Sequence, residues 1–207
     1  MKNEGFNYTA LKLCGVLGVV YVIQYATGFE PGFNASSSPL WKFFTSILGH
    51  SGPEHLFNNL FFIGAFGTVY ELVTDSETFL TTFLVAGIFA NISAFIFYPS
   101  SAIIGASGAA IGVLAALAVY RPNQVGLALG VPAPMWAVLV IYIAINLAGL
   151  SASNGVAYEA HLMGMIPGAV IGLYLRDTRD RKDDEDDLEA ENWKKKIREW
   201  EEKYMLR

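Results

Sequence analysis

Long apolar stretches separated by short polar segments make up the first 175 residues of the chain. A helix that crosses a membrane needs about 20 mostly apolar residues. Glycine, proline and charged residues divide this part of the chain into stretches of roughly that length. We therefore predict six membrane-spanning helices, at residues 9–28, 53–73, 78–98, 104–120, 132–151 and 157–175.

The connection between the first two predicted helices differs from the others. It is rich in turn-forming and aromatic residues and is longer than a simple connector requires, whereas the other connections are short. An even number of spans places both termini on one side of the membrane. We expect residues 9–28 to be a retained first span, because no cleavage site of small residues is clear and further apolar stretches follow.

Charged residues are concentrated at the end of the chain. Residues 176–207 hold 10 of the 14 lysines and arginines and 12 of the 19 aspartates and glutamates. A water-soluble domain would not keep as few charges as residues 1–175 do. We predict a membrane-embedded body at 1–175 and a charged tail at 176–207. The net charge of −5 does not suggest nucleic-acid binding.

The tail is predicted to have two parts. The charged run at residues 176–187 is typical of a disordered linker. Beyond it, apolar residues recur at helical spacing and predict a short amphipathic helix, with Trp193, Ile197, Trp200 and Tyr204 on one face. This helix would rest on the inner membrane surface, or dock on the body or on a partner.

The positions of lysine and arginine predict the orientation of the spans. One side of the predicted topology carries only Lys42. The side that holds both termini carries Lys2, Lys12, Arg121, Arg176, Arg179, Arg181 and Lys182. We predict a multi-pass protein of the cell membrane with both termini in the cytoplasm. The second, fourth and sixth spans then begin at the outer face.

All three histidines lie in the predicted membrane body. His50 and His55 flank the start of the second span, and His161 lies about one turn into the sixth. Ionisable residues at membrane depth are energetically costly and are often functional. A single histidine of this kind is about equally often structural, making a hydrogen bond between two helices. His55 and Asn59 are four residues apart and share one face of the second span.

Ser107 begins the fourth span between small residues, with Gly105 before it and Gly108 after it. A serine at a helix start is also an ordinary cap. The sixth span carries glycines at a spacing of four on the face that holds His161, namely Gly164, Gly168 and Gly172. Close packing of the fourth and sixth spans on such small residues would bring His161 beside Ser107.

These residue types fit a serine–histidine dyad. A serine hydroxyl becomes a good nucleophile when a nearby base takes its proton, which is the role that we predict for His161. Glu159 lies on another helical face, so we predict no acidic third residue. His55, Asn59 and the backbone N–H of Ser107 are candidate donors to an oxyanion. The three spans begin on the same side, so these residues would lie at one depth.

Other mechanisms lack the residues they need. Asp75 is the only aspartate before the tail, so an aspartyl protease lacks its pair, and Cys14 is the only cysteine. No HExxH zinc pattern occurs. His50 and His55 do not chelate a metal from one helix face. We predict no metal and no cofactor, although a metal held by His50, His55 and His161 stays open.

This pattern resembles the rhomboid intramembrane serine proteases over nearly all of residues 9–175. The resemblance rests on Trp41-Lys42 followed by Thr45, on His50, His55 and Asn59, on Gly105-Ala106-Ser107-Gly108, and on Ala160-His161 followed by Gly164 and Gly168. It implies an all-α bundle of six transmembrane helices. It also implies hydrolysis of single-span membrane proteins near the outer face, without metal or cofactor.

The resemblance also implies a role for each matching residue. It makes Ser107 the nucleophile, His161 the general base, and His55 and Asn59 the oxyanion donors. Supporting positions are His50, Trp41, Gly105, Gly108 and Gly164, and Glu71 matches a position thought to be structural. The chain departs from the family at two positions. Lys42 stands where arginine is common, and Ile111 stands where an aromatic residue often packs on the catalytic histidine.

Two other functions are compatible with part of the pattern. An inactive rhomboid-like protein would bind membrane helices without cutting them, but such relatives would be expected to lack Ser107 or His161. A small transporter would line a path with polar residues, whereas here they cluster near one face. We predict a serine endopeptidase whose partners are transmembrane protein substrates and the lipid bilayer; the oligomeric state stays open.

Overall fold

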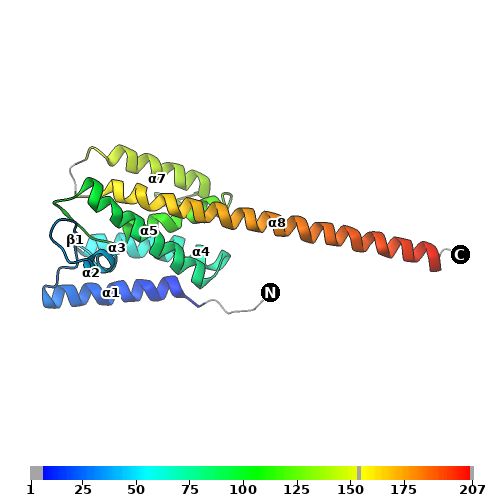
Figure 1. Cartoon of the computed structure of the whole chain (residues 1–207), viewed down its shortest axis with the longest axis horizontal. Coiled ribbons are helices and arrows are strands. Elements are labelled where there is room, and N and C mark those ends of the chain that lie inside the picture. Colours follow the sequence, from blue (N-terminus) through cyan, green and yellow to red (C-terminus); the bar gives the residue numbers. More distant parts are fainter. Residues whose placement is uncertain (1–6, 153–154, 206–207) are drawn as a thin grey trace.

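The computed structural model describes residues 7–152 and 155–205, and it is mainly helical (Figure 1). The helices are α1 (Thr9–Thr27), α2 (Trp41–Thr45), the 3₁₀ turn η1 (Ser46–Leu48), α3 (Pro53–Phe62), the π segment η2 (Ile63–Gly67), α4 (Thr68–Val73), α5 (Ser76–Phe97), α6 (Ser107–Tyr120), α7 (Met135–Gly149) and α8 (Tyr158–Tyr204). Two short antiparallel pairs join β1 (Phe33–Asn34) to β2 (Ala102–Ile103) and β3 (Val125–Ala128) to β4 (Val131–Pro134).

Each of the six predicted apolar stretches contains a helix, so the predicted helical class is confirmed. Among the described residues, three helical segments are long and apolar enough to cross a membrane, at Thr9–Thr27, Pro53–Val73 and Ser76–Phe97. Helices α6 and α7 are apolar but shorter, with 14 and 15 residues. Both helices begin three residues later than predicted, because Gly105 and Pro134 interrupt the helical backbone just before them. The count of six crossings stays a prediction.

The predicted disordered linker at residues 176–187 is wrong, because α8 runs without a break from Tyr158 to Tyr204. This charged run contains neither glycine nor proline. Opposite charges lie one turn apart and stabilise an exposed helix. These ion pairs are Arg176–Asp180 at 3.7 Å and Arg181–Asp177 at 2.8 Å. The second half of α8 extends away from the bundle as a single rod (Figure 1).

The long helices alternate in direction along the chain. As a result, α3, α6 and α8 all begin at the end of the bundle that carries β1 and α2 (Figure 1). The start of α1 lies towards the opposite end, as does the free end of α8. The three helices therefore begin at the same end of the bundle, as expected. Which end faces the cytoplasm stays a prediction.

Helix α6 lies at the centre of the bundle. Twelve of its fourteen residues are buried, and seven of these are alanine or glycine. Because these side chains are small, α8 approaches the α6 backbone closely. A Cβ atom added to Gly168 would lie 2.0 Å from the carbonyl oxygen of Gly112, and one added to Gly164 would lie 2.3 Å from that of Gly108. The glycine contact predicted between the fourth and sixth spans is confirmed.

Large apolar side chains cover much of the outside of the bundle. On α1, for example, Val19, Val22 and Ile23 are each more than half exposed. A continuous apolar exterior of this kind indicates contact with lipid, not with water. Together with the long apolar helices, this surface identifies a membrane protein.

Glu71 joins the end of the second apolar stretch to the start of the first. This buried carboxylate accepts hydrogen bonds from the backbone N–H groups of Thr9 at 2.9 Å and Ala10 at 3.0 Å, and from the Ser76 hydroxyl at 2.7 Å. The first N–H groups of a helix lack partners within the helix, and negative charge is favourable there. Glu71 therefore caps α1.

Candidate active site

The structure brings Ser107 and His161 together. Ser107 is the first residue of α6, and His161 lies one turn into α8. The distance from Ser107 Oγ to His161 Nε2 is 2.8 Å, which is a hydrogen bond. The close contact of the two helices makes this possible: a Cβ atom on Gly108 would lie only 3.2 Å from the carbonyl oxygen of Ala160. A hydroxyl so placed can pass its proton to the imidazole.

A residue of α7 that is absent from the predicted site also contacts His161. Asn146 is 2% exposed, and its Oδ1 lies 2.8 Å from His161 Nδ1. Glu159 instead accepts a hydrogen bond from the Tyr98 hydroxyl, consistent with its expected position on another face. An amide oxygen accepts a hydrogen bond as a carboxylate does. The signal in the sequence is a lone asparagine within an apolar stretch.

His55 and Asn59 both face the backbone just before Ser107. A Cβ atom on Gly105 would lie 2.6 Å from His55 Nε2 and 3.7 Å from Asn59 Nδ2. Gly105 also has a φ of 125°, which other residues rarely adopt, so glycine is required here twice over. Asn59 is buried, and its Nδ2 has no hydrogen-bond partner within residues 7–152 and 155–205. An unused donor is thus aimed at the segment that leads into Ser107.

The contacts of His55 determine which of its ring nitrogens carries the proton. His55 Nδ1 lies 3.4 Å from the backbone N of Ser51 and 3.0 Å from its hydroxyl. A backbone N–H can only donate, so we assign Nδ1 as the acceptor. The proton of the neutral ring is then on Nε2, the atom that faces Gly105. His55 therefore offers a second donor beside that of Asn59.

Comparison with known proteins identifies the family. The family model named "Rhomboid domain" matches residues 37–178, a range that contains Ser107, His161, His55, Asn59 and Asn146. The chain belongs to the rhomboid family. This confirms the resemblance inferred from the sequence.

Two curated rhomboid relatives are similar to this chain. The Bacillus subtilis (strain 168) protein named "Putative rhomboid protease YdcA" is 25% identical over 163 residues, which cover 75% of this chain and 76% of that protein. The Arabidopsis thaliana protein named "Rhomboid-like protein 11, chloroplastic" is 34% identical over 79 residues. That match covers 37% of this chain but only 28% of the chloroplast protein.

His50 is buried beside His55 of the candidate site. It is 2% exposed, and its ring packs edge-on against His55 with the centroids 5.3 Å apart. Its backbone N–H donates to the side chain of Gln24 at 3.0 Å, and its carbonyl oxygen accepts from the same amide at 3.1 Å. Burial, followed by the nearby His55, lowers the pKa of His50 to about 4. The ring is therefore neutral at neutral pH.

Trp41 lies in the long first loop, where it is half exposed. Among the contacts of the described residues, its ring stacks on Phe29 of the same loop at 6.2 Å. Lys42, which replaces the arginine common in rhomboids, donates from Nζ to the carbonyl oxygen of Glu30 at 2.7 Å. These contacts join residues within the loop, and they do not bring Trp41 to the Ser107–His161 pair.

Hydrogen bonds join the same loop to the segment that leads into Ser107. The Gly105 backbone N–H donates to the carbonyl oxygen of Ser46 at 2.9 Å. The Ser46 hydroxyl in turn accepts from Asn91 Nδ2 of α5 at 2.9 Å. Strand β1 of the loop pairs with β2, which ends two residues before Gly105. The first loop therefore holds in place the backbone that precedes Ser107.

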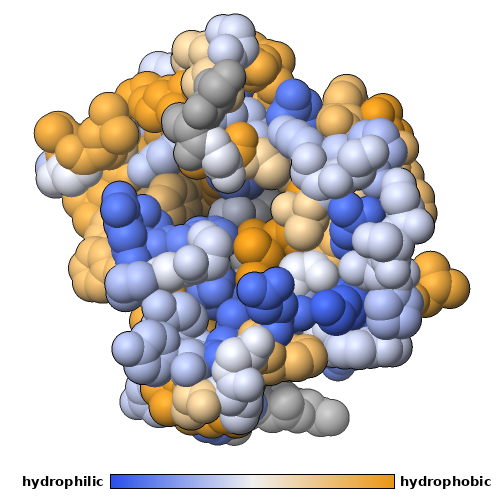
Figure 2. Space-filling model, turned by 90° about the vertical axis from the view of Figure 1, so that its left-hand side faces the viewer, coloured by the Kyte–Doolittle hydropathy of each residue, from blue (hydrophilic) through white to orange (hydrophobic). Residues whose placement is uncertain are grey.

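Figure 2 shows the end of the bundle at which α3, α6 and α8 begin. Hydrophilic and neutral residues occupy most of the middle of this face, and strongly apolar residues lie mainly towards its rim. This distribution differs from the apolar exterior along the helices. A polar middle inside an apolar rim is a surface that water can reach while lipid surrounds it.

Proposed function

We propose that this rhomboid is an intramembrane serine protease that cleaves single-span membrane proteins in or near their transmembrane helices. The observation that carries the proposal is the 2.8 Å hydrogen bond between Ser107 Oγ and His161 Nε2. A nucleophile and its base within hydrogen-bond reach are the minimum for covalent hydrolysis. The membership of the chain in the rhomboid family supports the same reaction.

The proposed reaction has two stages. His161 Nε2 takes the hydroxyl proton as Ser107 Oγ attacks the carbonyl carbon of the scissile peptide bond. The tetrahedral intermediate collapses when the carbon–nitrogen bond breaks and His161 gives its proton to the leaving amine. Water then attacks the acyl-serine ester and loses a proton to His161. The bond between the carbonyl carbon and Ser107 Oγ breaks, His161 returns the proton to Oγ, and the product acid leaves.

The oxyanion of each intermediate needs fixed donors. His55 Nε2–H and Asn59 Nδ2–H face the backbone beside Ser107, and the backbone N–H of Ser107 is at the start of α6, where helical N–H groups lack partners within the helix. In other hydrolases, one lost donor of this kind costs about 10²–10³ in rate. The unused donor of the buried Asn59 supports this role.

The setting of the site supports the proposed topology. The site lies at the end where α3, α6 and α8 begin. At the opposite end, Arg121 follows α6, and Arg176 and Arg179 lie near the middle of α8. By the positive-inside rule, the arginines belong to the cytoplasmic side and the site to the outer side. We propose six spans in the cell membrane. A substrate helix has to unwind locally before its backbone reaches Ser107.

A reporter with one transmembrane helix tests the proposal. The purified full chain in liposomes is expected to cut it at one position, found by mass spectrometry. A fluorophosphonate is expected to label Ser107, and His161→Ala should slow this labelling by about 10²-fold or more, the usual contribution of a general base. Labelling at an unchanged rate in a folded His161→Ala protein would remove His161 as the base. Reporter binding without cleavage would favour the inactive rhomboid-like function.

A further inference from the structure

Asn146 occupies the position from which the free nitrogen of the His161 ring can be held. Its Nδ2 donates to the carbonyl oxygen of Tyr142, one turn earlier in α7, at 2.7 Å. This bond directs Oδ1 towards His161 Nδ1, at 2.8 Å. An amide oxygen can only accept, so Nδ1 of His161 carries the proton of the neutral ring. The lone pair of Nε2 is then available to the Ser107 hydroxyl.

We propose that Asn146 is a positioning residue that keeps His161 in the tautomer and orientation needed for proton transfer. This inference rests on the proposed protease function. A neighbouring contact supports it: the Tyr158 ring meets the His161 ring edge-on at 6.1 Å. A Cβ atom on Gly149 would lie 2.4 Å from the Tyr158 ring, so α7 and the start of α8 are in tight contact beside Asn146. The amide orients the base without adding a charge.

Two near-isosteric substitutions test the role of Asn146. Asn146→Leu removes the acceptor and is expected to lower kcat by about 10²-fold with little change in KM, because misplacing a base affects the chemical step more than binding. Asn146→Asp keeps an acceptor and should restore most of the loss. Nitrogen-15 NMR of labelled histidine should show that the His161 Nδ1–H tautomer of the wild type is lost in Asn146→Leu. Leu147→Ala, at a half-exposed position of α7, is the control.

The outcomes separate this inference from the proposed function. If a folded Asn146→Leu protein keeps the wild-type kcat and the same histidine tautomer, Asn146 has no positioning role, while the protease function stands. If the Ser107→Ala protein cleaves the reporter as fast as the wild type does, the proposed function itself fails. Equal losses in Asn146→Leu and Asn146→Asp would also contradict the inference, because the acceptor would then not matter.

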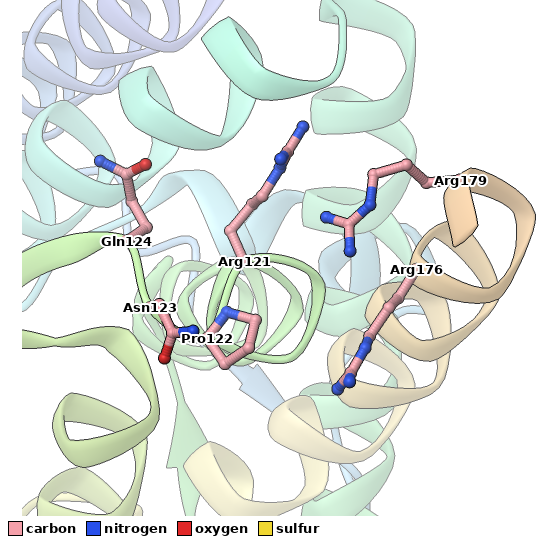
Figure 3. A pocket seen from close by; sticks show the side chains of 6 residues that line it. All are labelled: Arg121, Pro122, Asn123, Gln124, Arg176 and Arg179. Carbon is pink, nitrogen blue, oxygen red and sulfur yellow. The ribbon is translucent and has the colours of Figure 1, made fainter. Parts of the chain in front are cut away.

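A second inference comes from the opposite end of the bundle. A pocket of about 420 Å³ lies where α6 ends and the charged half of α8 begins. Its lining combines arginines with amide and proline side chains, namely Arg121, Pro122, Asn123, Gln124, Arg176 and Arg179 (Figure 3). In Figure 3 the side chains of Arg121 and Arg179 extend into the same space.

Contacts with the end of α6 hold two arginines of this pocket in place. The guanidinium groups of Arg121 and Arg179 lie 4.9 Å and 5.3 Å from the centroid of the Tyr120 ring. Arg179 also donates to the carbonyl oxygen of Tyr120 at 3.2 Å and to Asp180 at 2.7 Å. Arg121 Nε is buried and lacks a hydrogen-bond partner among the described residues. Three arginine side chains, including that of Arg176, therefore line this pocket, and Asp180 contacts Arg176 at 3.7 Å and Arg179 at 2.7 Å.

We propose that this pocket binds a phosphate group, carried by an anionic lipid headgroup or by free phosphate. Guanidinium groups match phosphate oxygens in geometry and charge. The pocket lies where the apolar residues of α6 end at Tyr120 and those of α8 end at Leu175, which is the level of lipid headgroups. Basic pockets between helices at this level are typical sites for such headgroups.

Vesicles of defined composition test the phosphate site. The full chain is expected to retain phosphatidylglycerol over phosphatidylcholine, measured by native mass spectrometry after extraction from mixed vesicles. The double variant Arg121→Gln/Arg179→Gln should weaken this preference about 25-fold, or about 5-fold for each charge. The control Lys194→Gln/Lys195→Gln removes the same charge about 23 Å farther along α8, beyond the screening length, and should change it less than about 3-fold. In a second arm, inorganic phosphate is added to vesicles of phosphatidylcholine alone. If the protein retains this phosphate but does not prefer phosphatidylglycerol, the free ion is the ligand.

The results contradict the site in two cases. Equal losses in the pocket variant and the control variant would indicate general surface charge in place of a pocket. Retention of neither phosphatidylglycerol nor phosphate by the wild type would remove the site. If circular dichroism shows that the double variant does not fold, Arg176→Gln, at a half-exposed position, takes its place with an expected loss of about 5-fold.

Discussion

Replacing Ser107 with alanine is expected to abolish cleavage of a single-span reporter, lowering kcat by about 10⁴-fold or more, as removal of the nucleophile does in soluble serine proteases. The substitution removes the oxygen that lies 2.8 Å from His161 Nε2. It leaves the backbone N–H of Ser107 and the contact between α6 and α8 intact. Labelling by a fluorophosphonate should vanish together with cleavage, and the melting temperature in detergent should change little.

Ser93→Ala is the matched control for this experiment. Ser93 is a fully buried serine of α5, and its hydroxyl has no hydrogen-bond partner in the described part of the chain. Its loss therefore removes a buried intramembrane hydroxyl without touching the Ser107–His161 pair, and cleavage is expected to persist. Equal cleavage by wild type and Ser107→Ala would exclude the serine mechanism.

Replacing Gly168 with alanine is expected to have the largest effect on stability. The added Cβ atom would lie 2.0 Å from the carbonyl oxygen of Gly112, a backbone atom that cannot move aside as a flexible side chain can. Helices α6 and α8 would have to separate, at a cost of about 3 kcal/mol in the free energy of unfolding. The separation would also draw His161 away from Ser107, so activity should fall in the protein that remains folded.

Gly18→Ala is the control for Gly168→Ala. Gly18 lies in α1, and a Cβ atom there meets nothing within 4 Å among the described residues. Because alanine favours a helix over glycine by about 1 kcal/mol, the control should leave stability unchanged or slightly raised. Unfolding of both variants in detergent, followed by circular dichroism, compares them. If the two glycines tolerate alanine equally, packing on Gly168 does not hold α6 against α8.

The helices and the contact between Ser107 and His161 were predictable because two strong physical signals lie in the sequence. Apolar length predicts where helices cross a membrane, and the spacing of Gly164, Gly168 and Gly172 predicts which face of α8 approaches α6. His161 lies on that face, so its contact with Ser107 follows. His55 and Asn59 follow from their spacing on α3. The number of crossings and the orientation stay predictions.

Other features depend on contacts between residues far apart in the chain. The hydrogen bond from His161 Nδ1 to Asn146 Oδ1 depends on how α7 rotates against α8, and spacing along either helix does not determine that rotation. The anchoring of Gly105 by Ser46 depends on the path of an irregular loop. The helical state of residues 176–187 was missed because composition alone indicated disorder, whereas pairs such as Arg181–Asp177 support a helix.

The continuity of α8 limits where the tryptophans of its second half can lie. At 1.5 Å per residue, a straight helix carries Trp193 about 27 Å beyond Leu175, where the apolar part of α8 ends. The headgroup layer on one side of a bilayer is only about 5–8 Å thick. Even at a tilt of 40°, Trp193 would be about 20 Å above the apolar boundary. A straight α8 therefore acts as a spacer that holds its aromatic residues in water, and adsorption of that stripe to the lipid surface requires a bend.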